Sequence, residues 1–432
     1  MDEPQVLGLR EEASAESGPV LVSSGSQAVL SGSEIAVVTH EGDVRVVRRL
    51  EPAKVKPRIK SLRIAMIGAR GVPATFGGVE HHVEELGSRL AARGHEVTVF
   101  SRSNYVEDRR DEYRGMKLRH LPTVGTKHLD AIVHSTISTL DAMRRGFDVI
   151  HYHAVGPGIP AMVPRLLSRS KVALTVHGLD GDRAKWGSGA QKVLKMAEWL
   201  SAKVPNATIA VSNDLANHYS DRYSTKAWHV PNGVHAVESK PADEITKRFG
   251  LKKGNYVLFV GRMVPEKAPD ALVRAFHKLP GDVRLVMAGD SSYTNEFVQS
   301  LRREAGADER VIFPGYVYGD TLNELYSNAG AFVLPSYLEG LPLTLLEAIS
   351  YGAPVITSDI PPHLEILGHD GPGHRLFPCG DEDALVAALR EAFQNQDLEQ
   401  MGAQVFKEEV LRRYCWDSAA EATEEVYEHL VK

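Results

Sequence analysis

The chain has 432 residues, a length that favours two domains because single hydrophobic cores rarely grow beyond about 250–300 residues. Its hydrophobic share of 43% and charged share of 25% are typical of a globular protein, and its formal net charge of −6 argues against a nucleic-acid-binding protein, which would carry a basic domain. Two cysteines are too few for a disulfide framework, and the sequence shows neither a membrane-spanning apolar run nor a signal pattern, so we expect a cytoplasmic enzyme.

Residues 1–60 form an extension to which we assign no chemistry. Residues 1–33 are rich in Ser, Gly, Glu and Ala, a composition that predicts disorder. Residues 35–47 predict a small hairpin around Glu41-Gly42-Asp43, and residues 51–60, with two prolines among basic residues, predict a linker.

From residue 61 onward strands alternate with helices, and we assign residues 61–235 to a first Rossmann-like domain. Apolar runs predict strands at 62–67, 96–100, 117–121, 148–153, 172–177, 208–211 and 228–230. Helical periodicity predicts helices at 79–93, 129–145, 159–168, 191–203 and 213–219. Such alternation indicates a parallel sheet that is covered by helices on both faces.

Residues 236–415 repeat this architecture in a second Rossmann-like domain. Strands are predicted at 256–260, 283–288, 311–313, 331–334, 355–357 and 375–377, and helices at 271–279, 296–305, 322–328, 343–351 and 382–394. Residues 416–432 predict a final amphipathic helix that packs back toward the first domain. The predicted fold class is therefore α/β, with two doubly wound domains that face each other across a cleft and bind ligands at the carboxyl ends of their strands.

One stretch, residues 335–348, carries two carboxylates beside a predicted helix start. Glu339 lies on a loop, and Pro342 stands where the helix would begin, because its fixed φ suits a first turn. Glu347 falls inside that helix among apolar neighbours, where an acid is costly unless a partner or ligand satisfies it. The pattern fits a polyhydroxylated ligand with an anionic group. The alternative is a core helix with one loop glutamate and one surface glutamate.

Residues 68–80 form a long glycine-rich loop after the first strand of the first domain. The loop lacks the glycine spacing of a dinucleotide fingerprint, no acid closes the next strand, and no Gly-Lys-Ser/Thr marks a P-loop. What remains is Gly77-Gly78 at a helix start, where backbone N–H groups can receive an anion. The alternative is a plain turn.

Several histidines lie at the ends of predicted elements. His177 ends a buried strand, either as a site residue or as a satisfied polar group. His151 and His153 share one face of another strand, but no further ligand stands beside them at metal spacing, so we expect no metal site. The pair His81-His82 opens a helix and is expected to face solvent in part.

A basic pair follows the first strand of the second domain. Arg262 and Lys267 are five positions apart across a turn, so both charges could converge on one diphosphate, the arginine as a fork and the lysine as a point charge. The alternative is two exposed cations on a loop. The position at a strand end favours the functional interpretation.

Together these residues resemble family 4 of the glycosyltransferases, retaining enzymes of the GT-B fold, over nearly all of residues 62–432. The most specific element is the pair Glu339 and Glu347, which matches the family's motif of two glutamates separated by seven residues. Four shorter segments support the resemblance in the right order: His177-Gly178, Pro231-Asn232-Gly233-Val234, Gly261-Arg262 with Glu266-Lys267, and Ala288-Gly289-Asp290. Residues 68–80 and 177–186 look most like the rhamnosyltransferase-like subgroup.

The resemblance implies that a sugar, rhamnosyl or hexosyl, is moved from a nucleotide-diphosphate sugar to a sugar, glycolipid or small-molecule hydroxyl, in polysaccharide or glycoconjugate biosynthesis. The first domain would serve the acceptor and the second the donor. Arg262 and Lys267 would hold the leaving diphosphate, Glu347 would accept hydrogen bonds from the ribose, and Glu339 would bind the transferred sugar.

The remaining implied contacts surround these groups. Backbone N–H groups of Gly340, Leu341, Pro342 and Leu343 would lie beside the donor, although Pro342 itself offers no N–H. His177 would lie across the cleft near the primary-carbon end of the sugar. Backbone at Gly315, Tyr316 and Val317 would read the base, and Gly77 and Gly78 would approach the phosphate from the first domain.

No cofactor or metal is expected, because the two cations would replace a metal at the diphosphate. Asp180-Gly181-Asp182 has the spelling of a metal-binding Asp-x-Asp pair, but it follows the first-domain His-Gly and is interpreted as a loop feature. A second interpretation is another GT-B-like enzyme, such as a nucleotide-sugar epimerase or a sugar phosphorylase, and a third is a non-catalytic nucleotide-sugar-binding relative. Basic, apolar-backed residues 165–171 allow peripheral contact with the inner face of a membrane, and a solvated helix end is the alternative.

Overall fold

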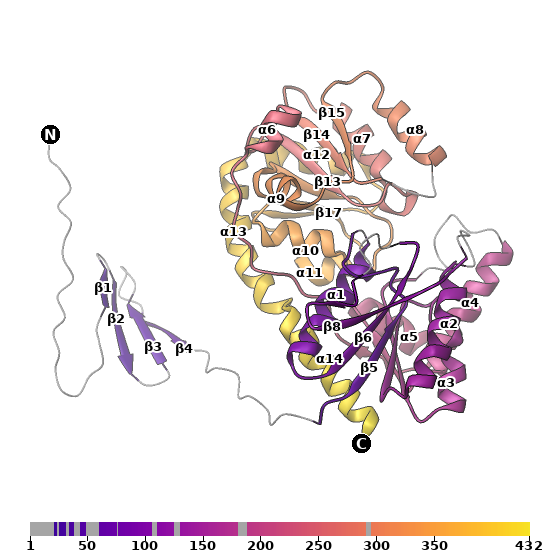
Figure 1. Cartoon of the computed structure of the whole chain (residues 1–432). Coiled ribbons are helices and arrows are strands. Elements are labelled where there is room, and N and C mark those ends of the chain that lie inside the picture. The colour runs from indigo at the N-terminus through magenta and orange to yellow at the C-terminus, as the bar shows by residue number, and fades with distance from the viewer. Residues whose placement is uncertain are drawn as a thin grey trace, which may run out of the picture. The chain divides into compact units, whose positions relative to one another are not determined.

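The computed structural model describes residues 60–75, 77–105, 110–124, 130–179, 188–290 and 295–432, and four strands between residues 21 and 48 (Figure 1). The chain divides into two units, Met1–Lys60 and Ser61–Lys432. In the first unit, neighbouring strands pair antiparallel in sequence order. These strands are β1 (Leu21–Ser23), β2 (Ser26–Ser31), β3 (Glu34–Val38) and β4 (Val44–Arg48). The pair β3 and β4 corresponds to the predicted hairpin, whereas β1 and β2 lie in the segment for which disorder was predicted.

The second unit begins with an eight-stranded sheet in the order β12-β11-β10-β9-β5-β6-β8-β7. All neighbours are parallel except β7, which pairs antiparallel with β8 at the edge. Its strands are β5 (Arg63–Ile67), β6 (Glu96–Arg102), β7 (Glu112–Tyr113), β8 (Met116–Leu121), β9 (Val149–His153), β10 (Lys171–Val176), β11 (Ala207–Ala210) and β12 (Trp228–His229). Its helices are α1 (Gly78–Ala92), α2 (Asp130–Arg145), η1 (Ile159–Ala161), α3 (Met162–Leu167), α4 (Ser188–Lys203) and α5 (Asn213–Tyr223).

A six-stranded, fully parallel sheet follows, in the order β15-β14-β13-β16-β17-β18. Its strands are β13 (Tyr256–Val260), β14 (Arg284–Ala288), β15 (Val311–Gly315), β16 (Ala331–Leu334), β17 (Val355–Ser358) and β18 (His374–Phe377). Its helices are α6 (Glu244–Phe249), η3 (Pro265–Lys267), α7 (Pro269–His277), α8 (Asn295–Ala305), α9 (Gly319–Asn328), α10 (Leu343–Ser350), α11 (Pro361–Leu367), α12 (Glu382–Gln394) and α13 (Gln396–Arg413). Counted from its first strand the order is 3-2-1-4-5-6, that of Rossmann-type sheets.

The last helix, α14 (Trp416–Val431), returns to the eight-stranded sheet and packs beside α1 (Figure 1). Trp416 and Tyr427 are almost fully buried there, and Glu424 binds Arg93 across the helix pair at 2.5 Å. We call this sheet with α1–α5 and α14 the first lobe, and the six-stranded sheet with α6–α13 the second lobe. The predicted fold class, two Rossmann-like α/β layers with a C-terminal helix, is confirmed.

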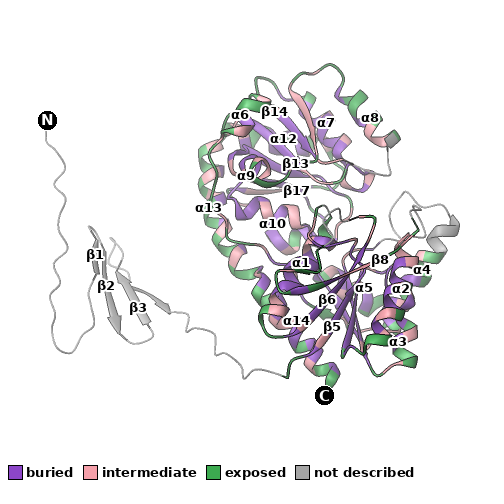
Figure 2. Cartoon of the chain, viewed as in Figure 1, coloured by how far each residue is buried: buried purple, intermediate pink, exposed green. Residues whose placement is uncertain are grey.

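Buried residues make up the sheets and the inner faces of the helices, while residues on the outer faces of the helices are exposed (Figure 2). The sequence analysis missed α6, α11 and the long α13. In α13 the four fully buried positions are Glu399, Ala403, Phe406 and Val410, which form one narrow stripe among polar residues. A helix that buries so little apolar surface leaves a weak periodic signal.

Candidate functional site

Each sheet has one point where the strand order reverses, and loops that leave the two strands there open a crevice. In the second lobe this point lies between β13 and β16, and in the first lobe between β5 and β9. Residues after β13 and β16 include Lys267 and Glu339, and the residues after β5 are those of the long glycine-rich loop. The sequence motifs therefore gather at the two places where an α/β fold binds ligands.

At the switch point of the second lobe, Lys267 and Glu339 form an ion pair. The Lys267 Nζ lies 2.6 Å from the Glu339 Oε1, and both side chains are nearly buried. The Ser336 hydroxyl donates a second hydrogen bond to the same oxygen at 2.8 Å. The Glu339 loop is held by its backbone as well, because the Tyr337 N–H donates to the Glu266 carbonyl at 2.9 Å.

The ionisation of Glu339 follows from this pairing. Burial raises the pKa of this carboxyl, but the Lys267 ammonium and the Ser336 hydroxyl outweigh it, so that the pKa lies below its usual value. The carboxylate is thus ionised at neutral pH and its charge is matched by Lys267. A charged group held in place before any ligand arrives is the arrangement needed to bind sugar hydroxyls or an anionic leaving group.

Glu347 lies on α10 with a different partner. Its Oε2 accepts a hydrogen bond from the Tyr326 hydroxyl of α9 at 3.0 Å, and Tyr326 stacks on Tyr351 with ring centroids 5.5 Å apart. Burial raises the pKa of Glu347, opposed by the charge of His81 and by the Tyr326 hydrogen bond. Sequence reasoning placed Glu347 inside an apolar helix; it did not anticipate that a buried tyrosine already satisfies one carboxylate oxygen.

The glutamate loop of the second lobe touches the first lobe directly. A Cβ added to Gly340 would lie 2.0 Å from the His177 carbonyl oxygen, so only glycine fits at this contact. The Asn232 amide donates to the Leu341 carbonyl at 3.1 Å. Gly78 faces Leu343 closely enough that an added Cβ would lie 3.6 Å from its Cδ1. The structure therefore places Gly340, Leu341 and Leu343 of the second lobe against His177, Asn232 and Gly78.

Arg262 follows β13 and the predicted base-reading residues end β15, the two strands that flank β14 in the second lobe. A Cβ on Gly289, after β14, would lie 2.0 Å from the Gly261 carbonyl oxygen, and the Gly289 N–H donates to the Gly315 carbonyl at 2.8 Å. Arg262 is exposed beside this contact. The Tyr316 ring is 41% exposed and stacks on Tyr318, and Val317 follows it on the same loop.

The loop before α1 is held by carboxylates that sequence reasoning did not identify. Glu80 accepts a hydrogen bond from the Arg70 N–H at 2.9 Å, and Glu84 accepts one from the Ala74 N–H at 2.7 Å. A Cβ on Gly77 would lie 2.2 Å from Glu80 Oε2. Gly77 and Gly78 thus stand at a helix start whose first-turn glutamate folds back onto the loop. The sequence signal that could have identified these carboxylates is the spacing of Glu80 and Glu84, one helical turn apart after a glycine-rich loop.

Four histidines lie together under this loop. His81 is partly exposed, as expected for this pair, but His82 is only 3% exposed. The reason is that α14 covers this part of α1 and places the Trp416 ring 5.7 Å from the His82 ring. The rings of His82 and His177 are 4.5 Å apart, and those of His151 and His153 are 4.2 Å apart. The expectation that no further ligand stands beside His151 and His153 at metal spacing is therefore wrong, because the fold brings the rings of His82 and His177 to 5.4 and 5.7 Å from that of His153.

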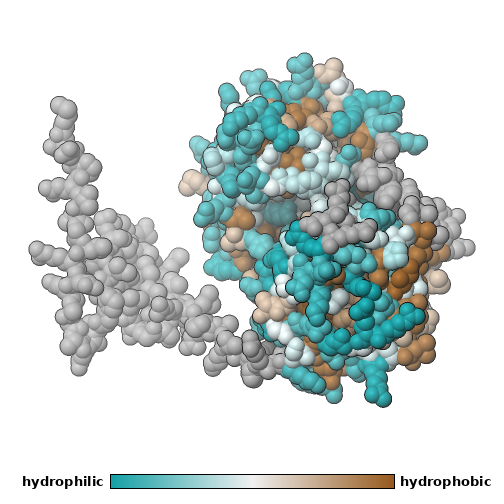
Figure 3. All heavy atoms as spheres, viewed as in Figure 1, coloured by the Kyte–Doolittle hydropathy of each residue, from teal (hydrophilic) through white to brown (hydrophobic). Residues whose placement is uncertain are grey.

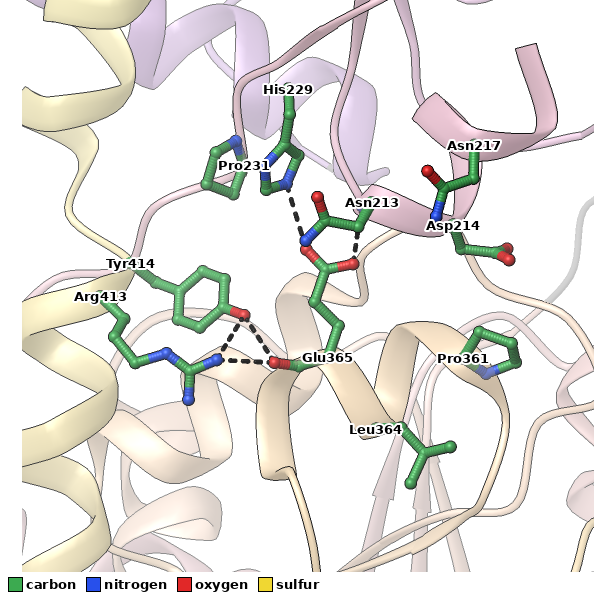
Figure 4. Close-up of a pocket in the computed structure, with 10 residues that line it drawn as sticks. All are labelled: Asn213, Asp214, Asn217, His229, Pro231, Pro361, Leu364, Glu365, Arg413 and Tyr414. Atoms are coloured by element: carbon green, nitrogen blue, oxygen red, sulfur yellow. Dashed lines mark hydrogen bonds and ion pairs between the residues drawn. The ribbon is translucent and has the colours of Figure 1, made fainter. Parts of the chain in front are cut away.

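A separate polar pocket of about 700 Å³ lies where the chain passes between the lobes (Figure 4). Glu365 of α11 points into it, accepts a hydrogen bond from the Asn213 N–H at 2.7 Å, and lies 3.1 Å from Nε2 of His229. Arg413 and Tyr414 hold the Glu365 carbonyl at 2.7 and 3.1 Å. None of the predicted site residues lines this pocket. Asp180 and Asp182 lie outside the described residues.

Two family descriptions match the chain, one in each lobe. Residues 76–237 match "Glycosyltransferase Family 4", and residues 241–407 match "Glycosyl transferases group 1". Together the two matches span more than half of the chain. Among curated relatives, the phosphatidyl-myo-inositol mannosyltransferase of Mycobacterium leprae is 29% identical over 389 residues, which cover 85% of this chain and 96% of the relative.

Solved structures show the same fold. Sucrose-phosphate synthase from Thermosynechococcus elongatus aligns with a TM-score of 0.74 at 24% identity, over 85% of this chain and 99% of that one. Anabaena HepE in complex with UDP and glucose aligns with a TM-score of 0.72 at 16% identity, over 85% and 100%. The chain therefore belongs to family 4 of the glycosyltransferases, retaining enzymes of the GT-B fold that transfer a sugar from a nucleotide-sugar donor.

Proposed function

We propose that the donor's diphosphate binds at the switch point of the second lobe and its sugar between Glu339 and His177. The observation that carries this proposal is the Lys267–Glu339 pair, which is buried, charged and positioned at the strand ends within reach of the Gly340–His177 contact. Lys267 and Arg262 would stabilise the departing diphosphate, and Glu347 would receive the ribose hydroxyls. The loop at Gly315, Tyr316 and Val317 would accommodate the base, and Gly77-Gly78 would approach the phosphate from the first lobe.

Glycosyl transfer demands stabilisation of an oxocarbenium-like sugar and of the leaving diphosphate. Glu339 is already charge-matched by Lys267, so it suits binding of ring hydroxyls better than proton transfer. We therefore propose attack on the same face as the leaving group, in which the acceptor hydroxyl gives its proton to the departing phosphate. No side chain serves as covalent nucleophile in this scheme.

The diphosphate chemistry is proposed to need no Mg²⁺ or Mn²⁺, because two cations of the chain occupy the place of such an ion. Transfer assayed in EDTA should proceed at the same rate as transfer with added Mg²⁺. An absolute requirement for Mg²⁺ or Mn²⁺ would contradict the role of Arg262 and Lys267.

The identity of the transferred sugar is a more specific part of the proposal. A hexosyl donor is supported by the UDP and glucose of the HepE complex, and a rhamnosyl donor by the spelling of residues 68–80 and 177–186 alone. A thermal-shift panel of UDP-, GDP- and dTDP-sugars separates the two, because a ligand that binds only the native state raises the melting temperature. The largest shift should come from the physiological donor, and transfer from that donor then confirms it.

For the acceptor, we propose a lipid-linked saccharide that is met at the inner face of a membrane. The mycobacterial relative carries phosphatidyl-myo-inositol in its name. On the first lobe, α3 and α4 expose an apolar cluster that is visible as a brown area (Figure 3). Leu166 is 71% and Leu167 75% exposed, and Arg165 and Arg169 are exposed next to them. None of the described helices is long and apolar enough to cross a membrane, so this contact would be peripheral.

Flotation with liposomes tests this contact. The wild type should float with vesicles that contain anionic phospholipid, and Leu166→Glu with Leu167→Glu should abolish flotation without changing the thermal stability, since both side chains are exposed. A wild type that stays entirely unbound would contradict the membrane contact while leaving the donor site untouched. The pair Leu398→Glu with Met401→Glu, exposed on α13 of the other lobe, is the matched control and should float normally.

A further inference from the structure

We propose that His82, His153 and His177 form a binding site for one divalent transition-metal ion of the Zn²⁺ type. The three residues come from α1, from the end of β9 and from the end of β10, and they meet at the switch point of the first lobe. One ring nitrogen from each lies within 4.8 Å of the other two. The site does not depend on the proposed donor chemistry, although it shares His177 with it.

The spacing of the rings fits a tetrahedral ion. A Zn²⁺ ion holds imidazole nitrogens at about 2.0–2.1 Å, which places the ligand atoms roughly 3.4 Å apart. The ring centroids of the three pairs lie 4.5, 5.4 and 5.7 Å apart, so small rotations of side chains bring the nitrogens to that spacing. Three histidines also leave a fourth position for water, as in sites built on three imidazoles.

The unused nitrogens point to an occupant. Nε2 of His82, Nε2 of His177 and both ring nitrogens of His153 are buried and have no hydrogen-bond partner among the described residues. A buried polar atom without a partner costs free energy, and three such groups in one place need an explanation. Their neighbour His151 differs, because Tyr427 and Thr175 occupy its two nitrogens at 2.6 and 2.7 Å.

The surroundings prepare His82 to act as a ligand. The Asn232 amide nitrogen donates to the Leu341 carbonyl, which turns the Asn232 Oδ1 toward His82 Nδ1 at 2.9 Å. His82 therefore donates from Nδ1 and keeps the lone pair of Nε2 free, the arrangement in which an outer hydrogen bond orients a metal ligand.

The ion would link α1 to the ends of two strands and, through Asn232, to the glutamate loop of the second lobe. An all-imidazole site selects Zn²⁺, Co²⁺, Ni²⁺ or Cu²⁺ over Mg²⁺, so independence of transfer from Mg²⁺ does not bear on it. An ion on Nε2 of His177 leaves the other ring nitrogen of that residue for a contact in the cleft.

Binding of Zn²⁺ and Co²⁺ to the metal-stripped full chain tests the site. We expect one equivalent of Zn²⁺ in competition with a chromophoric chelator, a rise in melting temperature on binding, and the intense visible absorption of tetrahedral Co²⁺. The Co²⁺ spectrum needs no variant, so it stands even if a core substitution impairs folding. A wild type that binds no Zn²⁺ would overturn the proposal and leave the donor-site proposal intact.

Substitutions locate the ion. His82→Asn and His153→Gln should each remove the bound equivalent, and Asn232→Ala should weaken binding by about 10–100-fold, as loss of an outer partner does. The matched control is His151→Gln, which changes a buried histidine on the same strand face but no proposed ligand. The proposal fails if His82→Asn and His153→Gln retain the equivalent, or if a folded His151→Gln loses it.

Discussion

The two switch points of this glycosyltransferase carry different kinds of side chain. In the second lobe the loops after β13 and β16 are fixed by charge, since Lys267 and Glu339 neutralise each other in a nearly buried place. In the first lobe the corresponding place holds neutral imidazoles whose nitrogens are largely unused. The same topology thus presents a preorganised ion pair at the switch point of the second lobe and a cluster of imidazoles at that of the first.

This difference indicates which lobe should stabilise the charge that develops during the reaction. A leaving diphosphate needs cations that are already in place, and at the switch point of the second lobe Lys267 is held in position by Glu339. The first lobe contributes shape and backbone contact, because Gly340 meets the His177 carbonyl with no room for a side chain. Substitutions that remove charge should therefore have strong effects in the second lobe and weak ones elsewhere.

The largest effect should come from Lys267→Ala. It removes the cation nearest Glu339 and leaves a buried carboxylate without its partner. We expect kcat to fall by about 10²–10³-fold, the range found when one stabilising donor of a developing charge is lost. Lys278→Ala, which breaks an exposed pair with Asp383, should leave steady-state rates unchanged. A Lys267→Ala variant that turns over as fast as the wild type would contradict this role of Lys267.

The next effect concerns Glu339→Gln, which should also lower kcat by orders of magnitude and should change acid stability. The folded-state pKa of Glu339 lies below its usual value of 4.5, so the pair stabilises the native state fully above pH 4.5 and this contribution is lost as the pH falls through the folded pKa. Urea unfolding should therefore show a stability difference between wild type and variant at neutral pH that shrinks in acid. A difference independent of pH would contradict the ionised pair.

A smaller effect is expected for Glu347→Ala, which tests binding and leaves the leaving-group charges in place. If Glu347 receives the ribose, its removal costs hydrogen bonds to a charged acceptor, and the donor Kd should rise by about 10–100-fold. Tyr326→Phe removes only the protein partner of Glu347 and should weaken binding far less. Calorimetry that finds equal affinity in Glu347→Ala and wild type would rule out the ribose role.

The smallest effect should follow Glu365→Gln, in a charged contact away from both switch points. This carboxylate joins α11 of the second lobe to Asn213 and His229 of the first. We expect the melting temperature to fall by no more than about 2–4 °C, since one such contact is worth on the order of 1 kcal/mol. Donor affinity should not change, and a loss of affinity would show that the lobe contact and the donor site are coupled.

Local patterns in the sequence predicted most of the strands and helices and the position of Glu339, Lys267 and Arg262 in the fold. Glu339, Lys267 and Arg262 lie on loops that directly follow strands, so the strand alternation alone places them at one edge of the sheet. The histidine cluster could not be predicted in this way. His82 reaches His153 and His177 through the packing of α1 on the sheet and against α14, which are contacts between residues far apart in sequence. The Tyr326 partner of Glu347 is also hidden, because it depends on how α9 packs against α10.

The return of α14 to the first lobe has a consequence for how the molecule is made. Trp416 and Tyr427 fill the space beside α1 and β9, and Tyr427 satisfies His151. During synthesis, the strands of the first sheet are complete long before these residues leave the ribosome. The first lobe therefore keeps an apolar surface exposed to solvent until α14 has been made. The second lobe, by contrast, is finished by α13 and has nothing further to receive. Shortening the C-terminus, or crowding it with a fusion partner, would therefore damage the opposite end of the chain.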